Sequence, residues 1–227
     1  MGSLLLAACF FVGIHLFVAG TGLRDRLVAR LGERAYLGLF SLASGVGIVW
    51  LSGAYVAASA ETRFLWQFPP SARSWATIAM GFAFLFVVIG LTTPSPTAAG
   101  GEARLASGAA ASGILRVTRH PFLMGVALWA GVHLVANGDT ASLLFFSALL
   151  VLALAGPVSI DRKRARKHGR EWQEFIRATS IVPFGAIAGG RNRLVLAEIG
   201  LWRPALAIVI WALVLVFHGA VFGVNVL

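Results

Sequence analysis

Residues 141–158 read ASLLFFSALLVLALAGPV, eighteen consecutive residues without a charged side chain. A helix that crosses the hydrocarbon core of a bilayer needs roughly 20 mostly apolar residues. Five further segments are comparably apolar, and the six together cover residues 4–20, 36–58, 75–91, 122–136, 141–158 and 201–221. The sequence therefore predicts an all-α, polytopic transmembrane bundle of about six helices, in a single domain that covers residues 1–227.

The composition supports a membrane protein and argues against a soluble one. Hydrophobic residues make up 58% of the chain and charged residues only 12%, whereas soluble domains carry about 25% charged residues. Lipid tails solvate apolar side chains directly, so a bilayer can accommodate this much apolar surface. The single cysteine, Cys9, excludes an intrachain disulfide and a CxxC metal or redox motif.

The distribution of basic residues predicts how the helices cross the membrane. The chain has 19 Lys and Arg residues and a net charge of +10, and 17 of the 19 fall in the first, third and fifth loops that six helices define or, for Arg203, at the edge of the fifth. Because basic loops stay on the cytoplasmic side, we expect a bacterial inner membrane protein with both termini in the periplasm. The expected partner of the basic side is the anionic lipid headgroup, not nucleic acid.

The fifth loop contains a further helical signal. Trp172, Phe175 and Ile176 recur at helical spacing beside a run of basic residues. This pattern is typical of an amphipathic helix that lies on the headgroup region of an anionic leaflet. An interfacial amphipathic helix is therefore predicted in the last cytoplasmic loop.

Three of the five histidines, His15, His133 and His218, fall inside predicted spans. Ionisable groups at such positions are costly and mark functional sites, although a neutral histidine bonded to a neighbouring helix is the structural alternative for each. Imidazole is an axial ligand of haem iron, and facing helices can hold a cofactor between them. The three histidines together indicate a bound haem. A zinc site is disfavoured, because the chain has one cysteine and no HExxH motif.

The depths of the three histidines along their spans are compatible with two different ligand pairs. His133 and His218 both lie in the outer parts of their helices, whereas His15 lies on the cytoplasmic side of its helix midpoint. At about 1.5 Å rise per residue, His15 and His133 differ in depth by roughly 10 Å. Either His15 or His218 can therefore pair with His133. We expect a structural role for His120, at the cytoplasmic end of the fourth span, and solvation for His168.

Several motifs are similar to those of a known family. They are RVTRHP at residues 116–121, the segment that continues through His133 to the NGD of residues 137–139, DRK at 161–163, and TSIVPF at 179–184. Together they resemble the NnrU family of membrane proteins, which includes zeta-carotene isomerases. The resemblance covers nearly the whole chain.

The resemblance implies haem b with His15 and His133 as iron ligands, and a haem-dependent cis–trans isomerase of an apolar isoprenoid. His218 stays in reserve as a ligand because of its position in a predicted span. An alternative cysteine ligand of the isomerase branch would fall at Ala130, where this chain has no sulfur. The bacterial branch is associated with nitrite and nitric oxide reduction, which implies an accessory factor for respiratory nitrogen-oxide reductases instead. No catalytic side chain is assigned.

A looser resemblance gives an alternative function. The RHP segment followed by a basic loop resembles membrane methyltransferases of the isoprenylcysteine and phospholipid type, in which His120 and residues 161–175 would bind S-adenosylmethionine. Leu123 stands where those enzymes have tyrosine, whereas Gly125 matches. The alternative is thus an S-adenosylmethionine-dependent membrane methyltransferase.

Overall fold

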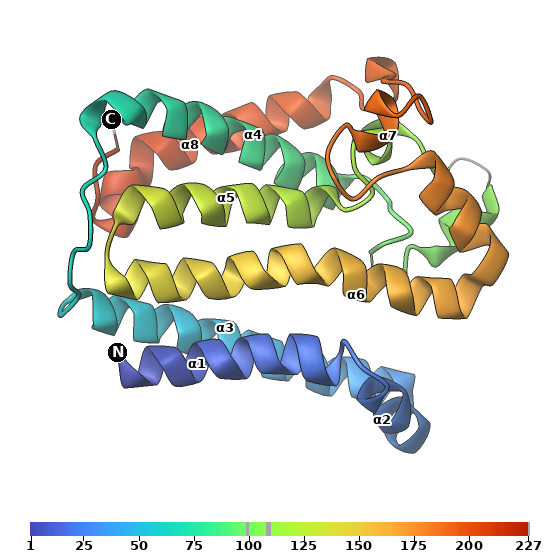
Figure 1. The fold of residues 1–227 in the computed structure, drawn as a ribbon, viewed down its shortest axis with the longest axis horizontal. Coiled ribbons are helices and arrows are strands. Elements are labelled where there is room, and N and C mark those ends of the chain that lie inside the picture. The colour runs from blue at the N-terminus through green and yellow to red at the C-terminus, as the bar shows by residue number, and fades with distance from the viewer. Residues whose placement is uncertain (99, 108–109, 227) are drawn as a thin grey trace. The chain divides into compact units, whose positions relative to one another are not determined.

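The structure is a computed structural model that describes residues 1–98, 100–107 and 110–226. All six predicted apolar segments form helices (Figure 1). The long helices are α1 (Gly2–Gly13), α3 (Glu33–Ser59), α4 (Arg73–Thr92), α5 (Pro121–Asn137), α6 (Thr140–Ala178) and α8 (Trp202–Phe222). Within the described ranges no β-strand forms beyond one isolated bridge. The predicted all-α fold is therefore confirmed.

Short helical elements fill the connections between these helices. They are η1 (Ile14–Val18), α2 (Leu23–Leu31), η2 (Pro70–Ala72), η3 (Glu102–Ser107), η4 (Gly113–Arg116), α7 (Gly185–Ala188) and η5 (Leu196–Glu198). The first of them, η1, is a π-helical turn that directly continues α1. The others are short, except α2 with nine residues.

Helix length and composition confirm a membrane protein. The helices α3, α4, α6 and α8 are long and apolar enough to cross a bilayer. A fifth span results if Gly2–Val18 and Leu23–Leu31, which are bent by 79° to each other, count as one. Helix α5 is apolar but has only 17 residues, which corresponds to roughly 25 Å at 1.5 Å per residue. The bundle thus has four to five long spans, and α5 as a sixth stays a prediction.

The chain forms two compact units. Unit 1 comprises residues 1–69 and 130–159, and unit 2 comprises residues 70–129 and 160–227, so that α5 and α6 contribute to both. In unit 1, α1 lies beside α3, and in unit 2, α4 lies beside α8 (Figure 1). In unit 1 the close approach needs Gly47, because a Cβ there would meet the ring of Phe11 at 3.0 Å.

The turn between α5 and α6 has a structural explanation. One carboxylate oxygen of Asp139 accepts hydrogen bonds from the backbone N–H groups of Ala141 (3.1 Å) and Ser142 (3.0 Å) and from the Thr62 hydroxyl (2.7 Å). Asp139 therefore satisfies the free N–H groups at the start of α6. Gly138 adopts a φ of +65°, which favours glycine.

Helix α6 contains the predicted amphipathic segment, and other parts of the protein pack against its apolar face. Trp172 is fully buried and Phe175 is 4% exposed, and both pack against Leu105 and Ala110. A sharp change of direction at Gly169, with φ +47° and ψ −113°, precedes this segment. The loop between α4 and α5 folds over the apolar face, so protein covers it instead of headgroups.

An acidic residue of the same loop fixes it to α6. Glu102 forms ion pairs with Arg164 and with Lys167 (2.7 Å), and it is hydrogen-bonded to Nε2 of His168 (3.0 Å). His168 therefore has a protein partner, and the prediction that it is only solvated is wrong. The sequence shows no local sign of this partnership, because Glu102 precedes His168 by 66 residues.

Candidate functional site

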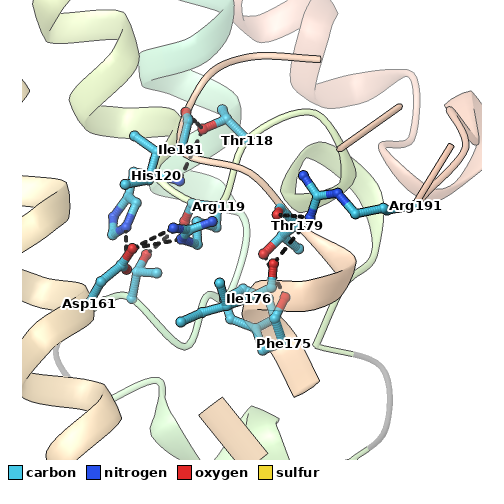
Figure 2. A network of polar contacts seen from close by, with 10 residues as sticks. Thr118, Arg119, His120, Asp161, Phe175, Ile176, Thr179, Ile181 and Arg191 are labelled. Carbon is cyan, nitrogen blue, oxygen red and sulfur yellow. Dashed lines mark hydrogen bonds and ion pairs between the residues drawn. The ribbon is translucent and has the colours of Figure 1, made fainter. Parts of the chain in front are cut away.

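The motif runs RVTRHP and TSIVPF lie side by side in unit 2 (Figure 2). The backbone N–H of Arg119 donates a hydrogen bond of 2.9 Å to the carbonyl oxygen of Ser180. The hydroxyl of Thr118, which is fully buried, donates to the carbonyl oxygen of Ile181 at 2.7 Å. These hydrogen bonds therefore hold the two runs against each other just before α5.

Asp161 of α6 joins the two residues that follow Thr118 (Figure 2). Arg119 donates through Nε (2.9 Å) and Nη2 (2.6 Å) to Oδ2 of Asp161, and Nε2 of His120 lies 2.8 Å from Oδ1. The side chains of Arg119, His120 and Asp161 are only 8%, 1% and 13% exposed. One carboxylate thus compensates a buried cation and fixes the orientation of an imidazole.

The protonation of His120 follows from its surroundings. Burial lowers the pKa of His120 and outweighs the opposing effect of its hydrogen bond to Asp161. The imidazole is therefore neutral near pH 7, with its proton on Nε2 because the ionised carboxylate only accepts. His120 also lines a pocket of about 500 Å³ at the end of α4, the following loop and the start of α5.

A second ion pair, between Arg116 and Glu198, fixes the segment that precedes α5. Arg116 donates through Nε and Nη2 to the two carboxylate oxygens of Glu198, both at 2.7 Å, and the N–H of Gly113 donates to Oε2 at 2.7 Å. These hydrogen bonds lower the pKa of Glu198 to about 2. The bidentate geometry fixes the planes of both groups, so Arg116 is structural.

His15, the first predicted ligand, lies in the π-helical turn η1 of unit 1. Its Nδ1 donates a hydrogen bond of 2.7 Å to the carbonyl oxygen of Phe11. The ring packs on Phe11 at 4.5 Å and edge-on against Phe40 at 5.2 Å between centroids. In a neutral imidazole with this tautomer Nε2 carries the lone pair, as metal-ligating histidines require. Single π-helical turns are frequent at functional sites.

His133, the second predicted ligand, also belongs to unit 1. Its ring stacks on the ring of Phe146, with 4.7 Å between the ring centroids and an interplanar angle of 22°. Among the described contacts of His15, all ring partners are phenylalanines, so the structure does not join the two histidines directly. Each ring is half-buried among aromatic side chains.

His218, the reserve ligand, belongs to unit 2. Its Nδ1 donates to the carbonyl oxygen of Val224 at 2.8 Å, and its ring packs on Phe222 at 4.9 Å. Over the described part of the chain, no group of three His, Cys, Asp or Glu side chains is arranged to bind a metal ion directly.

Sequence reasoning did not identify Asp161 as the partner of His120. The available signal is that Asp161 is the first charged residue after an apolar run and begins the DRK motif. That position predicts a special role but no partner, because the two residues are 41 positions apart.

Comparisons with known proteins agree with the motifs. The model of the NnrU protein family matches residues 3–226. A chloroplastic 15-cis-zeta-carotene isomerase of Arabidopsis thaliana is 27% identical over 199 residues, which are 85% of this chain and 52% of the plant protein. The isomerase of the same name from Zea mays is 31% identical over 83 residues, 37% of this chain and 23% of its own length. The chain thus spans about half the length of the Arabidopsis relative. No solved structure gives a significant match.

Proposed function

Because the chain belongs to the NnrU family, we propose that it is a membrane protein that binds haem b through His15 and His133 and isomerises a cis double bond of an apolar isoprenoid. The similarity to two plant proteins named 15-cis-zeta-carotene isomerase supports this reaction class. The membrane helices fit an apolar substrate, which would reach the site from the lipid.

The hydrogen bond from His15 to Phe11 is the observation that carries the proposal. A histidine that ligates iron through one ring nitrogen usually donates its other N–H to a carbonyl or carboxylate. His15 already meets this condition, with Nδ1 bonded to the backbone at 2.7 Å. The donor set also fits haem, because the porphyrin supplies four nitrogens and needs only one or two axial imidazoles from the protein.

The protein side of the site has an orienting role and a water-excluding role. Phe11 and Phe40 fix the ring of His15, and Phe146 fixes that of His133. When bound, the haem supplies a redox-active iron that can interact with the double bonds of a polyene. Aromatic rings around both histidines offer such a polyene an apolar surface and exclude water.

We assign His15, and not His218, as the partner of His133. His15 and His133 both belong to unit 1, whereas His218 belongs to unit 2 and bonds to the backbone of its own C-terminal segment. Ala130 is fully buried, three residues before His133, and offers no thiolate. The iron would therefore keep imidazole ligands only.

We further propose that the chain lies in a bacterial cytoplasmic membrane, with its basic loops toward the cytoplasm and anionic headgroups. The charge distribution supports this orientation. The polar face of the segment before Ala178 stays available to headgroups, since the side chain of Arg170 is 91% exposed.

Absorption spectra of the detergent-purified protein, oxidised and reduced, with a pyridine haemochrome assay, test the haem proposal. We expect a b-type haem near one per chain, strongly reduced in His15→Ala and His133→Ala, and retained in the matched variant His218→Ala. An unchanged Soret band in both ligand variants would overturn the assignment. Conversion of 15-cis-zeta-carotene by the loaded wild type, and not by His15→Ala, tests the reaction.

One observation supports a second candidate function. The pocket of about 500 Å³ beside His120 is a possible site for S-adenosylmethionine, which the methyltransferase alternative needs. Calorimetry with S-adenosylmethionine decides between the two functions, because the haem proposal predicts no binding. Co-purification with nitrogen-oxide reductase subunits, without turnover of any isoprenoid, would favour an accessory role.

A further inference from the structure

Two buried hydroxyl groups on α3 have no hydrogen-bond partner. The phenolic oxygen of Tyr36 is buried and unpaired, and the whole residue is only 4% exposed. The hydroxyl of Ser44, two turns further along the helix, is buried and unpaired as well. A buried polar group without a partner is destabilising, and native proteins rarely contain one without a reason. These hydroxyls therefore indicate a ligand.

Both hydroxyls lie on the face of α3 that carries the aromatic neighbour of His15. Tyr36, Phe40 and Ser44 are spaced by four residues, which places them on one side of the helix. The ring of Tyr36 stacks on Phe40 at 5.9 Å, and Phe40 contacts the ring of His15 at 5.2 Å between centroids. Two successive ring contacts thus connect the proposed iron ligand to the unpaired phenol.

A cation accompanies the phenol. The guanidinium carbon of Arg24 lies 5.4 Å from the centre of the Tyr36 ring. Arg24 has only long ion pairs, 3.5 Å to Asp25 and 3.4 Å to Glu33, and its side chain is 28% exposed. It can therefore turn toward another anion at small cost, since exposed ion pairs contribute little.

The position in the chain matches the interface of a bilayer. Tyr36 lies in the first turn of α3, next to α2, which is bent by 79° away from the preceding apolar helix. Charged groups are tolerated at the ends of membrane spans and are costly at their centres. An anionic group held by Tyr36 and Arg24 would therefore lie at the membrane surface while apolar parts of the same ligand lie deeper.

We propose that Tyr36 donates a hydrogen bond to a propionate carboxylate of the haem, and that Arg24 neutralises the same carboxylate. This inference rests on the proposed function, because it assigns the two residues to the haem held by His15. Haem b has an apolar macrocycle with two carboxylates on one edge, so His15 would hold the iron and Tyr36 the edge. A phenol O–H and a guanidinium are the donors that a carboxylate requires.

A comparison of two porphyrins tests the inference. They are haem b and its dimethyl ester, which lacks the free carboxylates. Haem-free wild-type protein is titrated with each porphyrin, and the Soret band gives the two affinities. We expect the wild type to prefer haem b over the ester. Tyr36→Phe should reduce this preference by roughly tenfold to a hundredfold, the effect of one hydrogen bond to a charged group. Arg24→Gln should act in the same direction.

Tyr55→Phe is the matched control, because the hydroxyl of Tyr55 already bonds to Ser142 at 2.9 Å and should not affect the preference. Tyr36→Phe keeps the ring and removes only an unpaired oxygen, so it should fold at least as well as wild type by thermal unfolding in the haem-free state.

The possible outcomes separate this inference from the proposed function. A wild type that binds neither porphyrin overturns the haem function, and this inference with it. A wild type that binds both, with the same preference before and after Tyr36→Phe, overturns only the role of Tyr36. If Tyr36→Phe instead weakens the binding of anionic lipid to the protein in nanodiscs, the hydroxyl donates to a lipid phosphate and the propionate assignment is wrong.

Discussion

Nε2 of His120 lies 2.8 Å from Oδ1 of Asp161, although 41 residues separate the two in the chain. The other oxygen of the same carboxylate accepts two hydrogen bonds from Arg119. The segment before α5 is thereby fixed to α6 through one acidic side chain. The carboxylate of Asp161 neutralises the buried charge of Arg119. Removal of the carboxylate would leave this charge buried without a counter-charge.

Asp161→Asn should strongly destabilise the protein. The amide keeps the size of the side chain but leaves the nearly buried guanidinium of Arg119 without a counter-charge, and breaking a buried ion pair from one side costs about 3–5 kcal/mol. Thermal unfolding of the detergent-purified protein measures the effect. Glu174→Gln is the control, because its pair with Arg170 is 60% and 91% exposed and contributes at most about 0.5 kcal/mol. Equal unfolding temperatures for the two variants would contradict the prediction.

His120→Ala should lower stability but leave the haem in place. The ring of His120 bonds to Asp161, and we assign the iron to His15 and His133. The ratio of haem to protein in the monodisperse fraction measures retention, and His133→Ala provides the comparison. Loss of the Soret band from well-folded His120→Ala would make His120 an iron ligand and reverse the assignment.

The helices could be predicted from the sequence, but the environment of the amphipathic segment could not. Uncharged runs such as residues 141–158 predict helices, because a bilayer imposes length and polarity on each span. The spacing of Trp172 and Phe175 predicts an apolar face without saying what covers it. Leu105 and Ala110 cover it in the structure, and nothing in their local sequence predicts this contact.

The same limit applies to the candidate site. The histidines in the spans could be selected because ionisable groups are costly in lipid, and in the structure His15 donates its Nδ1–H to the carbonyl oxygen of Phe11. The π-helical turn that carries it has no sequence signature. The pairing of Asp161 with His120 and the unpaired hydroxyl of Tyr36 depend on packing between distant segments, so only the structure could reveal them.

Gly138→Ala should destabilise the turn before α6. Gly138 has a φ of +65°, and a Cβ would come within 2.2 Å of the carbonyl oxygen of Trp66. The left-handed conformation alone costs about 1–2 kcal/mol for a residue with a Cβ, and the steric overlap adds to this. Gly131→Ala is the matched control within α5, where a Cβ meets nothing within 4 Å and alanine favours the helix by up to about 1 kcal/mol. A smaller loss for Gly138→Ala than for Gly131→Ala would refute this account.

The ion pair of Arg116 and Glu198 should make stability depend on pH in the acid range. Bonds from Arg116 and Gly113 lower the pKa of Glu198 from 4.5 to about 2 in the folded protein. A lowered pKa stabilises the folded state above pH 4.5, and this contribution is lost as the pH falls toward 2. Because the Glu198 side chain is 31% exposed, the contribution is about 1 kcal/mol or less.

Thermal unfolding of wild type and Glu198→Gln between pH 7 and pH 3 tests this linkage. The glutamine cannot ionise, so the variant should be less stable at pH 7, and the difference should shrink as the pH approaches 3. A difference that stays constant over this range would mean that Glu198 acts through packing and not through its charge.

The sides on which the two chain ends lie decide whether α5 crosses the membrane. With α5 as a sixth span both ends lie on the same side, whereas five spans place them on opposite sides. The positive-inside rule and the 17 basic residues of alternate loops predict both ends outside. Separate fusions at each terminus of a phosphatase active only in the periplasm and a fluorescent protein active only in the cytoplasm test this. We expect phosphatase activity and no fluorescence at both ends. Fluorescence at one end alone would show five crossings and place α5 in the bundle as a helix that does not cross.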